Sequence, residues 1–379
     1  MSNRPLANTP DNAQATRLLF LIIGFACAVW ASLVPFAKER TGLDEGALGL
    51  LLLCLGAGSI IAMPMSGALA TRFGCRTVLT ACTAVVCAML PLLAFVSSAP
   101  LLALVLFVFG GAIGAADCVM NVQAVIVERD SAKSMMSGFH GFFSVGGILG
   151  AAGASGLMTL GVSPLASTLS AVAIMLVMIA MAFRGLLPYG SRKEGPAFAI
   201  PHGVVLFLGT LALIVFLAEG AMLDWSAVFL TQERGMQSAQ AGFGYAAFAL
   251  LMTVGRLTGD KIVSHLGPRT IVTLGGAIAT LGIVVATFVP HWQVAVLGYA
   301  LVGLGCSNIV PVLFTATGRQ KTMPEAVAVP AISTLGYAGV LAGPAAIGFI
   351  AHHSSLPIAF LVVALMMAAV SGSGRLLRV

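Results

Sequence analysis

Apolar residues fill twelve long stretches of this chain, and short polar or charged segments separate them. Each stretch is about as long as a helix must be to cross the hydrocarbon core of a membrane, which is ~30 Å thick. The pattern therefore predicts an all-α membrane protein with twelve transmembrane helices. The expected helices span residues 17–37, 46–68, 77–97, 100–127, 134–160, 164–184, 203–230, 239–260, 270–289, 292–318, 324–350 and 355–373.

The expected helices divide into two equal sets. The longest hydrophilic stretch inside the chain runs from Pro188 to Pro201, with six expected helices on either side. The turn after the second helix of each set also repeats, as Arg-Phe-Gly-Cys-Arg at 72–76 and His-Leu-Gly-Pro-Arg at 265–269. A repeat this long indicates duplication of a six-helix unit. We predict two pseudo-symmetric six-helix bundles, at 1–187 and 203–379, joined by a cytoplasmic linker at 188–202.

Cations segregate to one side of the predicted membrane. Of the nineteen Lys and Arg residues, three fall on one side, namely Lys38, Arg40 and Arg234. The remaining sixteen fall on the other side: Arg4, Arg17, Arg72, Arg76, Arg129, Lys133, Arg184, Arg192, Lys193, Arg256, Lys261, Arg269, Arg319, Lys321, Arg375 and Arg378. Because membrane proteins keep an excess of cations in the cytoplasm, we expect a multi-pass protein of the bacterial inner membrane with both termini cytoplasmic.

Composition supports the same class of protein. Hydrophobic residues make up 59% and charged residues 8% of the chain, whereas a soluble domain is about a quarter charged. The net charge of +6 follows from the cations at the helix ends, so no nucleic-acid partner is expected. The polar first sixteen residues predict no secretory signal peptide, and we expect the first helix to remain in the protein.

Cysteine and histidine spacing argues against a metal or disulfide framework. The seven cysteines include no Cys-x-x-Cys pair, and six lie in or beside apolar stretches, where Cys packs as a small hydrophobe. Cys75 is expected in a short cytoplasmic loop. His352 and His353 are expected in a solvated loop, with no further ligand nearby in sequence. We predict no metal and no cofactor.

The repeated turn carries a family resemblance. The segment 67–76 reads Gly-Ala-Leu-Ala-Thr-Arg-Phe-Gly-Cys-Arg, which resembles the Gly-x-Leu-x-Asp-Arg-x-Gly-Arg-Arg signature of the major facilitator superfamily. The resemblance covers essentially the whole chain and implies that this turn helps to latch the two halves together. The implied latch residues are Gly67, Arg72, Gly74, Arg76, Arg256 and Asp260. Thr71 stands where the signature has Asp, and Cys75 replaces a basic residue, so we expect Asp260 to carry part of the latch.

A narrower resemblance concerns three other segments. The stretches 117–128 and 136–147 and the Glu-Gly-Ala-Met-Leu-Asp-Trp-Ser segment at 219–226 are similar to the fucose-permease-like branch of that superfamily. In such relatives, acids in these helices take part in proton-coupled uptake of small polar solutes such as sugars. The resemblance therefore implies a proton-coupled symporter.

The fourth expected helix has the most informative polar face. Asp117, Asn121 and Glu128 are four and seven residues apart, so they share one side of a helix. Ionisable groups inside a membrane are costly, and they usually face a cavity or a partner. Asp117 can hold a proton in a partly desolvated site, and Asn121 offers both a donor and an acceptor to a hydroxylated solute. Alternatively these groups only join helices, and Glu128 is the better candidate for a structural ion pair with Arg129.

Three further ionisable groups are candidates for proton coupling. Glu219 lies deep in the seventh expected helix without a cation nearby in sequence, and Asp224 follows near the other end. Trp225 suits either the membrane interface or stacking on a sugar. His140, in the fifth expected helix, can relay a proton because imidazole titrates near neutral pH, or it can be a buried hydrogen-bonded group that joins helices.

The remaining candidates come from the superfamily resemblance, in which the first, fourth, seventh and tenth helices line the central site. In this chain those helices add Trp30, Asn308 and Thr315 to the substrate-binding candidates Asp117 and Asn121. Pro311 shares a face with Asn308 and Thr315 and should break or bend the tenth helix.

The combined pattern predicts a secondary active transporter and not an enzyme. Two bundles would expose a central site to each side of the membrane in turn. There is no Walker motif, so a proton or sodium gradient must supply the work. We expect a monomer in the lipid bilayer that carries a small polar, sugar-like solute with protons. The alternatives are a proton-driven efflux pump for drugs or metabolites, a membrane-embedded enzyme, and a sensor that keeps the fold without turnover.

Overall fold

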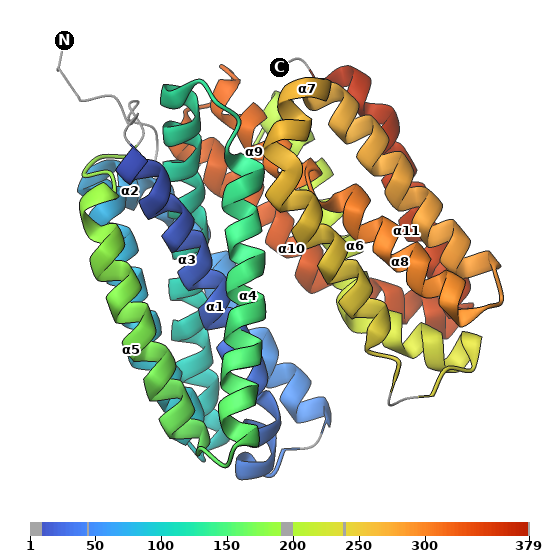
Figure 1. The fold of residues 1–379 in the computed structure, drawn as a ribbon, viewed down its shortest axis with the longest axis horizontal. Coiled ribbons are helices and arrows are strands. Elements are labelled where there is room, and N and C mark those ends of the chain that lie inside the picture. The colour runs from blue at the N-terminus through green and yellow to red at the C-terminus, as the bar shows by residue number, and fades with distance from the viewer. Residues whose placement is uncertain (1–9, 44, 191–199, 238–239, 378–379) are drawn as a thin grey trace. The chain divides into compact units, whose positions relative to one another are not determined.

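The regular secondary structure in the part of the chain that the structure describes is all helical. The computed structural model describes residues 10–43, 45–190, 200–237 and 240–377 (Figure 1). The helices are α1 (Pro10–Thr41), α2 (Glu45–Phe95), α3 (Ala99–Ser131), α4 (Met136–Thr159), α5 (Pro164–Ala182), α6 (Gly203–Arg234), α7 (Phe243–Phe288), α8 (Trp292–Cys306), α9 (Ile309–Arg319), α10 (Glu325–His353) and α11 (Leu356–Ser373). A short 3-10 turn follows α5 and another follows α11, namely η1 (Phe183–Gly185) and η3 (Gly374–Leu376).

Ten helical segments of the described chain are long and apolar enough to cross a membrane, which differs from the twelve separate helices expected. The difference arises at the two repeated turns, because α2 and α7 each contain two of the expected helices. Each continues through a glycine with non-helical dihedral angles, Gly74 (φ 82°, ψ 153°) and Gly267 (φ 76°, ψ 158°). Positive φ is readily available only to glycine, so each repeated glycine is the point at which a long helix kinks.

The tenth expected helix is interrupted, as the proline predicted. The helix α8 ends at Cys306 and α9 begins at Ile309, two residues before Pro311. A proline has no N–H and its ring collides with the carbonyl four residues earlier, which here belongs to Ser307. That carbonyl instead accepts a hydrogen bond from the Nε of Arg256, at 3.4 Å.

Burial differs strongly between helices. From Gly110 to Glu128, every residue of α3 is buried except Gly111 and Asp117, which are partly exposed. By contrast, α11 leaves Leu365 71% exposed, and large apolar side chains lie along its outside. A helix that is enclosed on all sides belongs to the interior, whereas exposed apolar side chains suit a lipid-facing surface. The interior position of α3 places Asp117 and Asn121 inside a helical unit.

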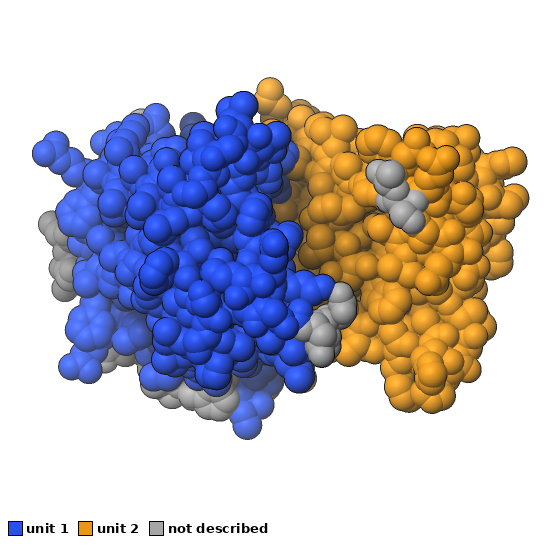
Figure 2. All heavy atoms as spheres, turned by 90° about the horizontal axis from the view of Figure 1, so that it is seen from below, with its two compact units in different colours: residues 1–133, 142–201, 323–334 blue, residues 134–141, 202–322, 335–379 orange. Residues whose placement is uncertain are grey.

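The chain forms two compact units (Figure 2). Unit 1 comprises residues 1–133, 142–201 and 323–334, and unit 2 comprises 134–141, 202–322 and 335–379. The start of α4 therefore groups with the second half of the sequence, and the start of α10 groups with the first half. Most of the predicted linker, at 191–199, lies outside the described residues, as do Arg4, Arg192, Lys193 and Arg378. The predicted domain boundaries stay a prediction.

Two smaller expectations are corrected by the structure. Cys75 does not lie in an exposed loop: it follows the kink of α2 and is fully buried. Its backbone N–H donates to the carbonyl of Tyr189. His352 and His353 form the last turn of α10, where His353 Nδ1 lies 3.0 Å from the carbonyl oxygen of Phe349. The helix includes both histidines and ends immediately before Ser354.

Candidate functional site

A buried ion pair lies inside unit 2. Arg256 of α7 is 6% exposed, and its Nη2 is 3.3 Å from the Oε1 of Glu219 on α6. The sequence shows no cation near Glu219, and it predicted Arg256 to be a cytoplasmic latch residue. In the structure Arg256 is instead buried and pairs with Glu219. A charge buried within a membrane helix needs a partner of opposite sign, and these two residues supply one to each other.

The break between α8 and α9 provides polar groups beside this pair. The Nδ2 of Asn308 donates to the carbonyl of Gly255 at 3.0 Å and lies 3.0 Å from the Oγ of Ser307. A Cβ at Gly259 would overlap the Oδ1 of Asn308, so a glycine is needed for α7 to approach this closely. Within the described chain, Asn308 Oδ1 is buried without a hydrogen-bond donor.

Two other predicted residues lie in the same unit. His140, at the start of α4, stacks on Phe314 of α9 with ring centroids 5.7 Å apart. Thr315 follows Phe314 and is partly exposed. His140 is buried, 9% exposed, and lies within electrostatic range of Arg256. The structure thus brings His140 to the region of the Glu219 ion pair.

Asp224 and Trp225 are placed differently from Glu219. Asp224 is exposed on α6, five residues beyond Glu219 and on another face of the helix. Trp225 packs on α10, where a Cβ added to Gly348 would stand 3.1 Å from its indole ring. The indole therefore packs between α6 and α10 within unit 2. This role differs from the two that the sequence suggested, an anchor at the membrane interface and a stacking surface for a sugar.

Tyr245 of α7 is a residue that the sequence argument missed. It lies within electrostatic range of Glu219, Arg256 and Asp224, and its ring is tilted against Phe248 with centroids 5.8 Å apart. A signal was present in the spacing, because Tyr245 precedes Arg256 by eleven residues, which is about three turns of a helix. Both therefore lie on one side of α7, and Tyr245 adds a hydroxyl to the polar face of unit 2.

Unit 1 contains the other predicted polar face. The Nδ2 of Asn121 donates to the carbonyl of Asp117 at 2.9 Å, which confirms that the two share one side of α3. Among the described residues, the buried Oδ1 of Asn121 has no donor. Asp117 is within electrostatic range of Cys27 on α1, and Trp30, one turn along, is 4% exposed. Asn121 thus keeps an acceptor, while its amide donor already binds its own helix.

The start of α4 is held by an acid in unit 2. Both carboxylate oxygens of Asp260 lie 3.1 Å from the backbone N of Gly138, in the first turn of α4. The first N–H groups of a helix lack partners within the helix and carry partial positive charge, so a carboxylate stabilises them. A Cβ at Gly138 would overlap that carboxylate. Of the predicted latch residues, Asp260 is the one that contacts a helix start through its charge.

The start of α10 is held by other means in unit 1. A Cβ at Gly67 would overlap the carbonyl oxygen of Ala326, so α2 and α10 meet backbone to backbone. Arg129, near the end of α3, forms an ion pair with Glu325, the first residue of α10. Thr71 donates its hydroxyl to the carbonyl of Gly67 in its own helix, at 3.0 Å. In this chain, where Thr71 replaces the Asp of the family signature, the close contact of Gly67 with Ala326 and the Arg129–Glu325 ion pair hold the start of α10.

Arg72 and Arg76 have separate positions. Arg72 lies over the ring of its neighbour Phe73, 5.1 Å from the centroid. Arg76 donates from Nε to the carbonyl of Leu186 and from Nη2 to that of Arg184, both at 3.0 Å, and it lies over Phe183. Arg76 therefore joins the kink of α2 to η1, and the contacts described here do not join it to the start of α10.

Comparisons with known proteins agree with this architecture. The profile of the Major Facilitator Superfamily matches residues 18–329. The chain belongs to this superfamily. An uncharacterised transporter of this superfamily from Yersinia pestis is 53% identical over 363 residues, covering 95% of this chain and 94% of that protein. The resemblance found in the repeated turn is thus confirmed, and the chain is a superfamily transporter.

Solved structures of other superfamily members share the fold. The fucose:proton symporter FucP of Escherichia coli superposes with a TM-score of 0.77 at 15% identity, covering 96% of this chain and 98% of that one. The proton:xylose symporter XylE superposes with a TM-score of 0.74 at 13% identity, covering 96% and 94%. At these identities the likeness concerns the fold alone.

Proposed function

We propose that this protein is a secondary active transporter that moves a small polar, sugar-like solute across the bacterial inner membrane together with protons. In this proposal the chain crosses the membrane twelve times, because the kinks at Gly74 and Gly267 divide α2 and α7 into two crossings each. The fold likeness to a fucose:proton and a proton:xylose symporter supports a sugar-like solute. The cation distribution supports cytoplasmic termini.

The observation that carries the proposal is the pairing of a buried cation with Glu219. The guanidinium of Arg256 and the carboxylate of Glu219 lie 3.3 Å apart, so each compensates the buried charge of the other. The pair therefore supplies fixed polarity beside the free acceptor of Asn308. Together they suit hydrogen bonding to the hydroxyl groups of a solute.

Asp117 is the better candidate for the proton. In the described chain its carboxylate forms no ion pair, and it sits on the interior helix α3. A carboxylate without a cation loses little when it is neutralised, whereas a paired one loses its partner. We assign proton binding to Asp117 in unit 1 and solute binding to Glu219, Arg256 and Asn308 in unit 2.

The helix starts of α4 and α10 provide contacts that an alternating-access cycle can break and re-form. Asp260 holds the first turn of α4, and Gly67 with the Arg129–Glu325 pair holds the first turn of α10. We propose that these contacts latch one state of the transporter. They are individually weak enough to open, because helix-end charges and partly exposed ion pairs each contribute about 1 kcal/mol or less.

Proton flux in proteoliposomes tests the proposal. Purified protein is reconstituted with a pH-sensitive dye inside, and sugars, sugar acids and cationic drugs are added outside in turn. We expect a pH change inside only with a neutral or acidic polyhydroxylated solute. A response confined to cationic drugs would favour drug efflux instead, and no response from folded protein would contradict proton-coupled transport of a polar solute.

A further inference from the structure

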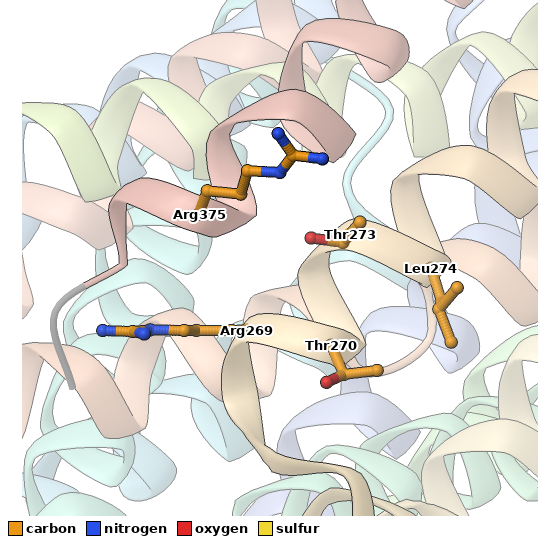
Figure 3. Close-up of a pocket in the computed structure, with 5 residues that line it drawn as sticks. All are labelled: Arg269, Thr270, Thr273, Leu274 and Arg375. Atoms are coloured by element: carbon orange, nitrogen blue, oxygen red, sulfur yellow. The ribbon is translucent and has the colours of Figure 1, made fainter.

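A basic recess lies in unit 2 where α7 resumes after its kink (Figure 3). It has a volume of about 300 Å³ and is lined by Arg269, Thr270, Thr273, Leu274 and Arg375. The lining thus contains two guanidinium groups and two hydroxyl groups, and none of the five residues is acidic. The first four residues come from α7, and Arg375 comes from η3.

The backbone at the recess favours an anion as well. Gly267 interrupts the helix and Pro268 follows it, so a new run of helix begins beside Arg269 and Thr270. Proline at the first position is typical of a helix start, and the N–H groups of a helix start attract anions. A Cβ at Gly374 would overlap the Oγ1 of Thr273, so this glycine allows η3 to bring Arg375 against α7.

The equivalent place in the first half is covered. There, a Cβ at Gly74 would overlap the carbonyl of Pro188, which runs past the kink after η1. Arg76 is engaged twice by carbonyl oxygens and lies 5.2 Å from the ring centroid of Phe183. The segment that leaves η1 therefore fills the space beside the kink in unit 1.

The second half keeps the same frame, and within the described chain no segment packs over its kink. Arg269 donates from Nε to the carbonyl of Leu377 at 2.7 Å, as Arg76 does to Leu186. Around Gly267, however, the described chain has no atom within 4 Å of an added Cβ. Figure 3 shows Arg269 extended away from Arg375, with the hydroxyl of Thr273 directed toward η3. The described chain thus leaves an open recess beside two arginines, and none of the five residues that line it is acidic.

We propose that this recess binds a phosphate group, either that of an anionic lipid headgroup or free phosphate. Arginine matches the geometry of phosphate oxygens, and the threonine hydroxyls can donate to the same group. The site lies on the predicted cytoplasmic side, where basic pockets between membrane helices bind anionic headgroups. Leu266 and Leu376 leave 47% and 67% of their surfaces exposed beside it, which suits the acyl chains of a lipid.

Lipid binding to the purified full-length protein tests this proposal without any transport measurement. Delipidated protein in detergent is titrated with phosphatidylglycerol, cardiolipin, phosphatidylcholine or inorganic phosphate, and native mass spectrometry and thermal stability report binding. We expect the two anionic lipids to bind at least roughly tenfold more tightly than phosphatidylcholine, because charge-assisted hydrogen bonds to phosphate are strong.

Single substitutions localise the effect. Arg375→Gln should remove most of the preference for anionic lipids and leaves the bond between Arg269 and Leu377 in place. Arg269→Gln should also reduce the preference for anionic lipids. If that variant fails to fold, Arg375→Gln alone tests whether the recess binds them. Arg319→Gln, at an exposed arginine that does not line the recess, is the matched control.

Each outcome decides the question. Anionic-lipid binding that falls in Arg375→Gln and persists in Arg319→Gln establishes a headgroup site. Stabilisation by inorganic phosphate with the same dependence on Arg375 establishes a site for free phosphate. Equal binding of all ligands by Arg375→Gln and the unchanged protein would overturn the proposal.

Discussion

The kinks at Gly74 in α2 and Gly267 in α7 are the same turn in two halves of one chain, yet their surroundings differ. Both glycines have positive φ, and both turns are followed by an arginine whose Nε binds a carbonyl beyond a 3-10 turn. The backbone geometry has thus been kept in both copies. The residues that pack around the kink have not been kept, since Pro188 packs on Gly74 whereas the described chain leaves Gly267 open.

A second difference lies seven residues before each kink. Gly67 occupies this position in the first copy and Asp260 in the second. Gly67 allows α2 to touch the start of α10, whereas Asp260 caps the start of α4. One task, holding a helix start, is therefore performed by close packing in one copy and by charge in the other. The comparison teaches that duplicated geometry constrains the backbone more strongly than the side chains.

The largest effect is expected inside unit 2, where Glu219 is paired with a cation, whereas the described chain pairs Asp117 of unit 1 with none. Glu219→Gln leaves the guanidinium of Arg256 buried without its carboxylate and should cost about 3–5 kcal/mol of folding free energy. Arg256→Gln should cost less, because an isolated Glu219 can become neutral by binding a proton. Unfolding of both variants in mixed micelles measures the order, and equal losses would contradict the asymmetry.

The two helix starts should respond differently to an added methyl group. In Gly67→Ala the methyl meets a backbone carbonyl of α10, which can move only with its helix, so we expect α2 and α10 to separate and transport to fall at least roughly tenfold. In Gly138→Ala the methyl meets the side chain of Asp260, which can rotate away, so the loss should be smaller. Solute uptake by the two variants decides this, and a larger loss in Gly138→Ala would count against the packing explanation.

The two kinks offer a matched pair with smaller effects. Gly267→Ala should cost about 1–3 kcal/mol, which is the strain of a residue with a side chain at φ 76° and ψ 158°, since the described chain leaves the methyl room. Gly74→Ala should cost more, because its methyl also meets the carbonyl of Pro188. Thermal unfolding of both variants gives the comparison. Equal destabilisation would mean that the cover over the first kink does not matter.

Much of this arrangement could be predicted from the sequence. Hydropathy identified the apolar segments, spacing placed Asp117 and Asn121 on one face of α3, and Pro311 predicted the break between α8 and α9. These features depend on residues close together in the chain. The offset between the repeated turns also marked both glycines that later proved to have positive φ.

The rest depends on contacts between distant residues. Glu219 and Arg256 are separated by 37 positions, and Asp260 and Gly138 by 122, so no local pattern could pair them. The twelve expected crossings stay a prediction, because α2 and α7 each consist of two helical runs that meet at a glycine with non-helical dihedral angles. Tyr245 was missed because a tyrosine in an apolar segment stands out only once Arg256 is known to be buried.

Proton-driven accumulation by Asp117→Asn tests the proton assignment most directly. Once the proteoliposome panel has identified a solute, accumulation under an imposed pH gradient is compared with exchange of labelled and unlabelled solute, for unchanged protein, Asp117→Asn and the exposed-acid control Glu233→Gln. Asp117→Asn should lose accumulation and keep exchange, because a neutral amide cannot carry the proton but leaves the solute groups of unit 2 intact. Glu233→Gln should retain both. Undiminished accumulation by Asp117→Asn would contradict the assignment of the proton to this residue.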